Sequence, residues 1–160
     1  MNPIPLFTYG TLMSSQPEHA IHCERPLSTQ PAQARGSLWK LREGYPILQI
    51  DPNTAILDAS ADLLADTARA AQIAQTSAPQ PAEGKWIQGE LMEISPAPDA
   101  LRKMDEWENF APGVKSAYQR RMIWIKDQAG LDRAAWAYVC YSPPNWASLL
   151  QSDRWSADAR

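Results

Sequence analysis

Seven residues near the start of the 160-residue chain combine a strand end, a glycine and a polar loop: Phe7-Thr8-Tyr9-Gly10-Thr11-Leu12-Met13. The first three are residue types that favour a β-strand, and Gly10 interrupts that strand. A glycine at this point permits a positive φ or the close approach of a ligand. Beyond it, the backbone N–H groups of Thr11 and Leu12 could line a concavity that binds a carboxylate or an oxyanion. The stretch therefore predicts an anion-binding loop, and a plain strand followed by a turn is the simpler alternative.

A second group of reactive side chains follows at residues 16–24, where a short helix is expected after Ser15. His19 and Cys23 are four residues apart and would share one helical face, close to His22. These side chains are ligands for soft metals, but no further ligand group follows at a recognisable spacing. We therefore predict no metal site, and nothing in the sequence calls for another cofactor.

Composition excludes several classes of protein. A hydrophobic fraction of 44% is ordinary for a globular protein, and the length fits a single domain over residues 1–160. The net charge of −3 offers no basic surface for nucleic acid. No apolar run approaches the roughly 18 residues that a membrane span needs, and the N-terminus lacks a signal-peptide pattern. Cys23 and Cys140 are expected to be buried thiols, which fits a cytoplasmic protein. The oligomeric state is not predicted.

Local patterns predict an α+β fold in which strands outnumber helices. The order lacks the regular alternation of a doubly wound sheet, so we expect mainly antiparallel or mixed pairing. Segment 52–84 is expected to be a helical and loop insertion, because an alanine-rich helix is followed there by a proline-rich connector. The expected strands are 4–9, 32–41 with a bulge at Gly36, 47–50, 85–94, 118–126 and 133–141. The expected helices are 58–75, 98–108 and 145–152.

Six short motifs, in this order along the chain, resemble those of the γ-glutamylcyclotransferase-like superfamily. The resemblance covers about residues 7–141 and implies a small mixed or antiparallel β-barrel with flanking helices. It also implies a pocket at the barrel mouth, beside the loop that contains Gly10. The motifs are Phe7-Thr8-Tyr9-Gly10-Thr11-Leu12, Gly36-Ser37-Leu38-Trp39 with Tyr45-Pro46, Gly89-Glu90-Leu91-Met92-Glu93-Ile94, Met104-Asp105-Glu106-Trp107-Glu108, Tyr118-Gln119-Arg120 and Trp136-Ala137-Tyr138.

The same resemblance implies an activity. Characterised enzymes of the superfamily release an amine or amino acid from a γ-glutamyl compound while the glutamyl part cyclises to 5-oxoproline. Their catalytic acid/base closes a Leu-Asp-x-x-Glu-Gly motif and falls here on Glu108, while Asp105 resembles the structural aspartate. Asn109 stands in place of the glycine, and asparagine tolerates the left-handed geometry of such a turn. Segment 52–84 is longer than usual, and either folds over the pocket or is a passive surface insertion.

Cyclisation of a γ-glutamyl compound needs a group that transfers protons and donors that hold the oxyanion or the substrate carboxylate. A single carboxyl group can take a proton from the substrate amine and return it to the departing nitrogen, and Glu108 suits this if Trp107 and Tyr138 partly bury it. The N–H groups of residues 10–12 would hold the substrate carboxylate or the oxyanion. Tyr9 either donates its hydroxyl or only packs. Tyr138 either bonds to the substrate amine or to Glu108, or is a half-buried strand residue.

Three functions fit these residues. The first is a γ-glutamyl cyclotransferase acting on a small γ-glutamyl substrate, which the presence of Glu108 favours. The second is a non-catalytic metabolite-binding or regulatory protein on the same scaffold, and the third is a related acyl-transfer or lyase reaction on another amide. The sequence does not predict the leaving group. Arg120 is expected to be structural and to pair with a carboxylate across strands.

Overall fold

Strands dominate the part of the chain that the computed structural model describes, which comprises residues 3–10, 13, 25–73, 84–96, 98–111 and 116–156. The strands are β1 (Ile4–Thr8), β2 (Ser28–Lys40), β3 (Pro46–Gln49), β4 (Ala55–Asp58), β5 (Lys85–Ile94), β6 (Gln119–Lys126), β7 (Asp132–Cys140) and β8 (Ser148–Leu149). The helices are a short 3₁₀ turn (Pro52–Thr54), α2 (Leu63–Ile73) and α3 (Pro98–Trp107).

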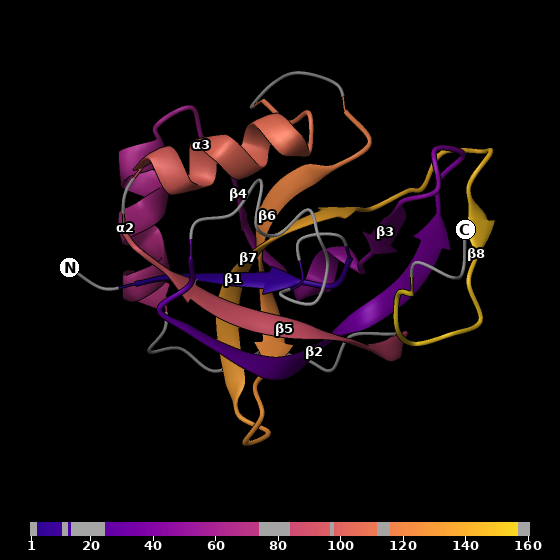
Figure 1. Cartoon of the computed structure of the whole chain (residues 1–160), viewed down its shortest axis with the longest axis horizontal. Coiled ribbons are helices and arrows are strands. Elements are labelled where there is room, and N and C mark those ends of the chain that lie inside the picture. Colours follow the sequence, from indigo (N-terminus) through magenta and orange to yellow (C-terminus); the bar gives the residue numbers. More distant parts are fainter. Residues whose placement is uncertain are drawn as a thin grey trace.

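Five of these strands close into a barrel (Figure 1). Hydrogen-bonded neighbours run β1-β5-β2-β3-β7, and β7 returns to β1 through the parallel pair Leu6 and Trp136. β6 and β4 extend the sheet beyond β7, and β8 pairs with β2. β7 runs parallel to both β1 and β3, while the other pairs are antiparallel. The predicted α+β fold with a small mixed β-barrel and flanking helices is confirmed.

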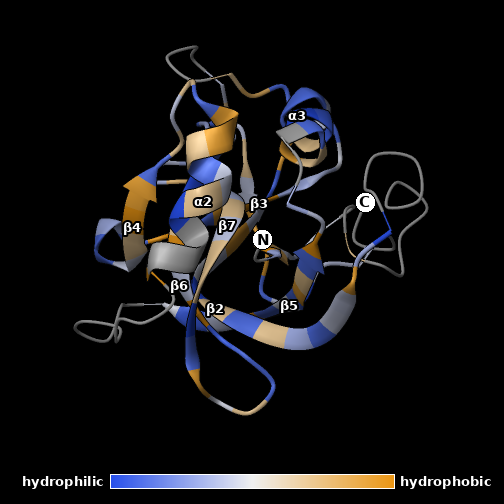
Figure 2. Cartoon of the chain, turned by 90° about the vertical axis from the view of Figure 1, so that its left-hand side faces the viewer, coloured by the Kyte–Doolittle hydropathy of each residue, from blue (hydrophilic) through white to orange (hydrophobic). Residues whose placement is uncertain are grey.

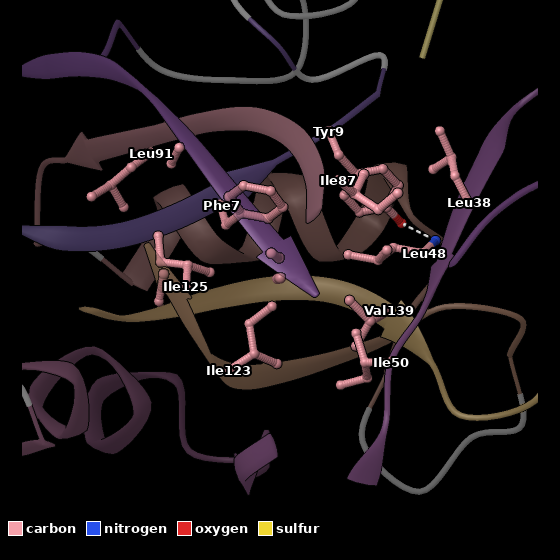
Figure 3. Packing of buried hydrophobic residues seen from close by; sticks show 14 of the residues in the cluster. Phe7, Tyr9, Leu38, Leu48, Ile50, Ile87, Leu91, Ile123, Ile125 and Val139 are labelled. Carbon is pink, nitrogen blue, oxygen red and sulfur yellow. Dashed lines mark hydrogen bonds between the residues drawn. The ribbon is translucent and has the colours of Figure 1, made fainter. Parts of the chain in front are cut away.

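Side-chain alternation along the strands separates two apolar cores. Phe7 of β1 points into the barrel, where it packs among branched aliphatic side chains that Figure 3 shows from close by. Leu6 and Trp136 point to the opposite side of the sheet and pack against Leu101 and Met104 of α3. Helix α3 presents hydrophobic residues on one face and hydrophilic residues on the other (Figure 2), which explains why it covers this side of the barrel.

Two of the local predictions are wrong. Residues 145–152 do not form a helix: a turn leads into β8, and the N–H group of Leu150 donates to the carbonyl of Leu38 at 2.8 Å. Pairing with the edge of β2 outweighs the local helical preference there. Gly36 does not form a bulge, because the pairing of β2 with β5 keeps one register up to Gly36. Position 36 requires a glycine because a Cβ there would lie 2.3 Å from the carbonyl oxygen of Gln49 in β3.

Segment 52–84 contains more than the predicted helix and loop. After the 3₁₀ turn, its residues Ala55–Asp58 form β4, which extends the sheet by pairing with β6. Helix α2 begins only at Leu63, where Asp62 accepts the N–H group of Ala65 at 3.0 Å. The segment is therefore partly integrated into the sheet, and its residues 74–83 lie outside the described residues.

Candidate active site at the barrel mouth

A cavity of about 210 Å³ opens where β1 ends and α3 ends. A wider groove of about 770 Å³ adjoins it, and the two share Tyr45, Trp107, Glu108 and Tyr118. Such a concave site with mostly aromatic walls and a few polar groups is typical of small-molecule binding. The cavity is lined by Phe7, Thr8, Tyr9, Gly10, Tyr45, Pro46, Trp107, Glu108, Tyr118 and Tyr138.

Glu108 is placed by the way α3 ends. Asn109 adopts a left-handed φ of 52°, as its tolerance of that geometry predicts. The N–H group of Asn109 donates to the carbonyl of Glu106, and that of Phe110 donates to the carbonyl of Asp105. This pair of hydrogen bonds is a Schellman motif, in which Glu108 is the last residue before the chain reverses. The motif fixes the backbone of Glu108 at the cavity wall.

The carboxyl group of Glu108 lies in a poorly solvated position. The residue is half-buried among the cavity's aromatic side chains, and burial raises the pKa of its carboxyl group to about 8. At neutral pH the group therefore carries a proton for a substantial part of the time. A carboxyl with a pKa near the working pH is able both to donate and to accept a proton, as a general acid/base must.

Tyr138 belongs to a buried network behind the cavity. Its hydroxyl donates to Asp105 Oδ1 at 2.6 Å, and Asp105 also accepts from Arg120 Nε at 2.8 Å. Arg120 in turn donates to Asp66 Oδ2 at 3.2 Å. Burial, followed by the charge of Asp105, raises the pKa of Tyr138, so the phenol stays neutral. With its hydrogen committed to Asp105, the Tyr138 oxygen can only accept hydrogen bonds from a ligand.

Arg120 pairs with carboxylates, as predicted, but its partners Asp66 and Asp105 come from α2 and α3 rather than from neighbouring strands. Helix α2 thereby contributes a side chain to the network behind the cavity. The described residues of segment 52–84 line neither the cavity nor the adjoining groove.

Tyr9 and Gly10 hold neighbouring strands together at the barrel mouth. The Tyr9 hydroxyl donates to the carbonyl of Tyr138 at 2.6 Å and accepts the N–H group of Leu48 at 3.0 Å, the contact drawn in Figure 3. Its hydrogen is therefore used within the fold, while the residue still lines the cavity. A Cβ on Gly10 would lie 2.6 Å from Pro46 Cγ, so the glycine permits close contact with the first residue of β3.

The loop that follows Gly10 is only partly described. The N–H group of Met13 donates to the carbonyl of Gly10 at 3.1 Å. Thr11 and Leu12, predicted to bind the substrate, lie outside the described residues, as do His19, His22 and Cys23. Cys140 is a buried free thiol.

Sequence reasoning assigned no role in the site to five cavity residues: Phe7, Thr8, Tyr45, Pro46 and Tyr118. All of them occur in the motifs that carry the resemblance, so their positions were an available signal. Tyr118 donates its hydroxyl to the carbonyl of Pro46, which ties the start of β6 to the start of β3. Thr8 stands in the first of these motifs, but its residue type by itself indicated only a preference for a strand.

The described residues contain no group of three or more His, Cys, Asp or Glu side chains that could hold a metal ion. In the same ranges, every helix is too short or too polar to cross a bilayer.

The fold is a closed β-barrel with flanking helices and a cavity at its mouth. Residues 6–56 and 59–157 match the family described as gamma-glutamyl cyclotransferase, AIG2-like, and the chain belongs to this family. A search of curated proteins finds no match.

Solved structures support the fold. An AIG2-like protein from Mus musculus superposes with a TM-score of 0.59 at 15% identity, covering 98% of this chain and 90% of the mouse chain. YkqA from Bacillus subtilis gives a TM-score of 0.56 at 19% identity, covering 97% of this chain and 40% of YkqA. A protein from Arabidopsis thaliana gives 0.53 at 16% identity, covering 91% of this chain and 75% of the plant chain.

Proposed function

We propose that this protein is a γ-glutamyl cyclotransferase that releases an amine or amino acid from a γ-glutamyl compound and forms 5-oxoproline. The observation that carries the proposal is the carboxyl group of Glu108, which lines a cavity at the barrel mouth and has a pKa of about 8. Membership of the gamma-glutamyl cyclotransferase, AIG2-like family supports the same reaction class.

Ring closure requires the α-amine of the substrate to attack its own γ-carbonyl carbon. An α-amino group has a pKa of about 7.7–8.0 in peptides, so near neutral pH it is largely protonated and unreactive. Glu108, with a pKa of about 8, is matched to this group and can accept its proton with little cost. Because both reacting atoms belong to one bound molecule, holding them together lowers the barrier further.

The proton then returns to the leaving group. The new bond joins the α-nitrogen to the carbonyl carbon, and the bond from that carbon to the departing nitrogen breaks. Glu108 donates the proton it has taken to the departing nitrogen, and the α-nitrogen releases its second excess proton to solvent as the ring forms. Both nitrogens therefore end neutral, and the Glu108 carboxylate is ready for the next cycle. The transient oxyanion would be stabilised by backbone N–H groups of residues 10–12, where one donor is worth about 10²–10³ in rate.

The adjoining groove offers space for the leaving group. It meets the cavity at Glu108, where the departing nitrogen must take its proton, and it continues past Tyr45 towards Trp146. Its volume of about 770 Å³ exceeds that of the cavity, so a leaving group larger than the glutamyl part can be accommodated.

The test is release of 5-oxoproline from a panel of γ-glutamyl amines, γ-glutamyl amino acids and glutathione. We expect the wild type to turn over at least one of them and Glu108→Gln to lose about 100-fold or more in kcat, because the amide cannot exchange a proton. Glu106→Gln is the matched control, since Glu106 is exposed on the same helix and does not line the cavity. Binding without turnover of any compound would point instead to a metabolite-binding protein on this scaffold.

A further inference from the structure

The hydroxyl group of Thr8 is buried without a partner. Thr8 is 4% exposed, and its Oγ1 makes no hydrogen bond within the described part of the chain. Leaving a buried hydroxyl unpaired costs about 1–3 kcal/mol, so such a group in a folded protein calls for an explanation. Two other side-chain atoms share this condition among the described residues, Thr54 Oγ1 and Trp155 Nε1, but neither of those residues lines the cavity.

The register of the barrel places Thr8 beside Tyr138. Leu6 of β1 pairs with Trp136 of β7 in the parallel direction, so two residues further along both strands Thr8 comes alongside Tyr138. Side chains two residues apart point to the same face of a strand. Because Leu6, Trp136 and Tyr138 all pack on the face covered by α3, Thr8 points to that face as well. This is the side of the barrel on which α3 ends at Trp107, directly before Glu108.

The polar groups on this side favour an amine over a carboxylate. The Tyr138 oxygen can only accept, because its hydrogen is donated to Asp105. The Thr8 hydroxyl has free lone pairs, and the Glu108 carboxyl exchanges a proton. The described residues that line the cavity include no Lys, Arg or His, so this wall lacks the cation that usually pairs with a carboxylate.

We propose that Thr8 Oγ1 accepts a hydrogen bond from the α-amino group of the bound glutamyl moiety. Together with the Tyr138 oxygen it holds the amine beside Glu108, which takes its proton. This inference rests on the proposed function, since it assigns a specificity residue to the same site. It makes Thr8 the residue that distinguishes a glutamyl compound from a glutaryl compound, which has the same chain without the α-amine.

The test compares the binding of L-glutamate and glutarate, which differ only in the α-amine and carry no amide to be cleaved. Wild type, Thr8→Val and Thr54→Val are titrated with each compound by calorimetry. We expect the wild type to bind L-glutamate more tightly than glutarate. In Thr8→Val the ratio of the two dissociation constants should fall about tenfold, because the affinity for L-glutamate drops while that for glutarate is unchanged. Thr54→Val is the matched control, because Thr54 is 3% exposed and its hydroxyl also lacks a partner among the described residues, yet Thr54 does not line the cavity.

Thermal unfolding of the same variants excludes misfolding as the cause. Valine has nearly the shape of threonine, and removing an unpaired buried hydroxyl is expected to leave the melting temperature unchanged or higher. The inference is wrong if the wild type does not prefer L-glutamate, if Thr8→Val keeps the preference, or if Thr54→Val loses it equally. The protein could also show a preference for L-glutamate that depends on Thr8 and yet release no 5-oxoproline from any compound. That result would contradict the cyclotransferase proposal but would support the role of Thr8 in binding the amine.

Discussion

At the scale of single residues, Glu108 links activity to stability through one proton. Burial raises the pKa of its carboxyl group from 4.5 to about 8 in the folded protein, whereas the unfolded chain has no such burial. Between these two values the folded protein holds a proton that the unfolded chain has lost. By linkage, the free energy of unfolding falls as pH rises through this window. The environment that suits Glu108 for catalysis therefore makes the protein less stable under basic conditions.

We predict opposite trends for activity and stability between pH 5 and pH 8.5. Activity that requires ionised Glu108 should rise up to about pH 8, as measured by kcat/KM for 5-oxoproline release. The stability of the wild type relative to Glu108→Gln should fall over the same range, by an amount on the order of 3 kcal/mol. Urea denaturation of both proteins at the two ends of the range measures this difference.

Glu106→Gln is again the control for the pH series, because Glu106 is exposed on the same helix. Its stability should follow that of the wild type at every pH. A constant difference between wild type and Glu108→Gln across the range would contradict a raised pKa at Glu108.

At the scale of elements, α2 supports the wall of the cavity through one buried carboxylate. Asp66 is 0% exposed and accepts hydrogen bonds from the backbone N–H and hydroxyl groups of Ser60 and from Arg120. Arg120 also holds Asp105, which holds the hydroxyl group of Tyr138. Helix α2 does not line the cavity, but it supports the cavity wall through this chain of charge-assisted hydrogen bonds.

We predict that Asp66→Asn destabilises the protein by about 3 kcal/mol, because removing one partner of a buried ion pair leaves the other charge poorly compensated. Urea denaturation at pH 7 measures the loss. Asp58→Asn is the matched control, since Asp58 pairs with Arg121 at the surface and its side chain is 72% exposed. Exposed pairs contribute at most about 1 kcal/mol. Equal unfolding midpoints for the two variants would show that the buried network contributes little.

At the scale of the whole molecule, the sequence was sufficient where structure follows from local patterns and insufficient where it depends on distant partners. Strand residues such as those of β5 and β6 and the asparagine at the end of α3 carry local signals, and these predictions are confirmed. The pairing of β8 with β2 joins segments far apart in the chain. Arg120 and Asp66 are likewise 54 residues apart. The unpaired state of the Thr8 hydroxyl depends on all of its neighbours, so no pattern in the sequence could indicate it.

Closure of the barrel depends on close contact at Gly36, and this gives a prediction for the whole fold. A Cβ there would lie 2.3 Å from the carbonyl oxygen of Gln49 and 2.9 Å from Leu48 Cδ1, so β2 and β3 would have to separate. We expect Gly36→Ala to lower the free energy of unfolding by about 3 kcal/mol, as overpacking of a rigid contact does. Gly130→Ala is the comparison, because Gly130 has a φ of +82° but nothing within 4 Å of its added Cβ. Gly130→Ala should therefore lower the free energy of unfolding only by the local backbone strain, about 1–2 kcal/mol. Urea denaturation of the two variants separates these contributions. A larger loss of unfolding free energy in Gly130→Ala than in Gly36→Ala would mean that β2 and β3 move apart easily, so that their contact does not limit closure of the barrel.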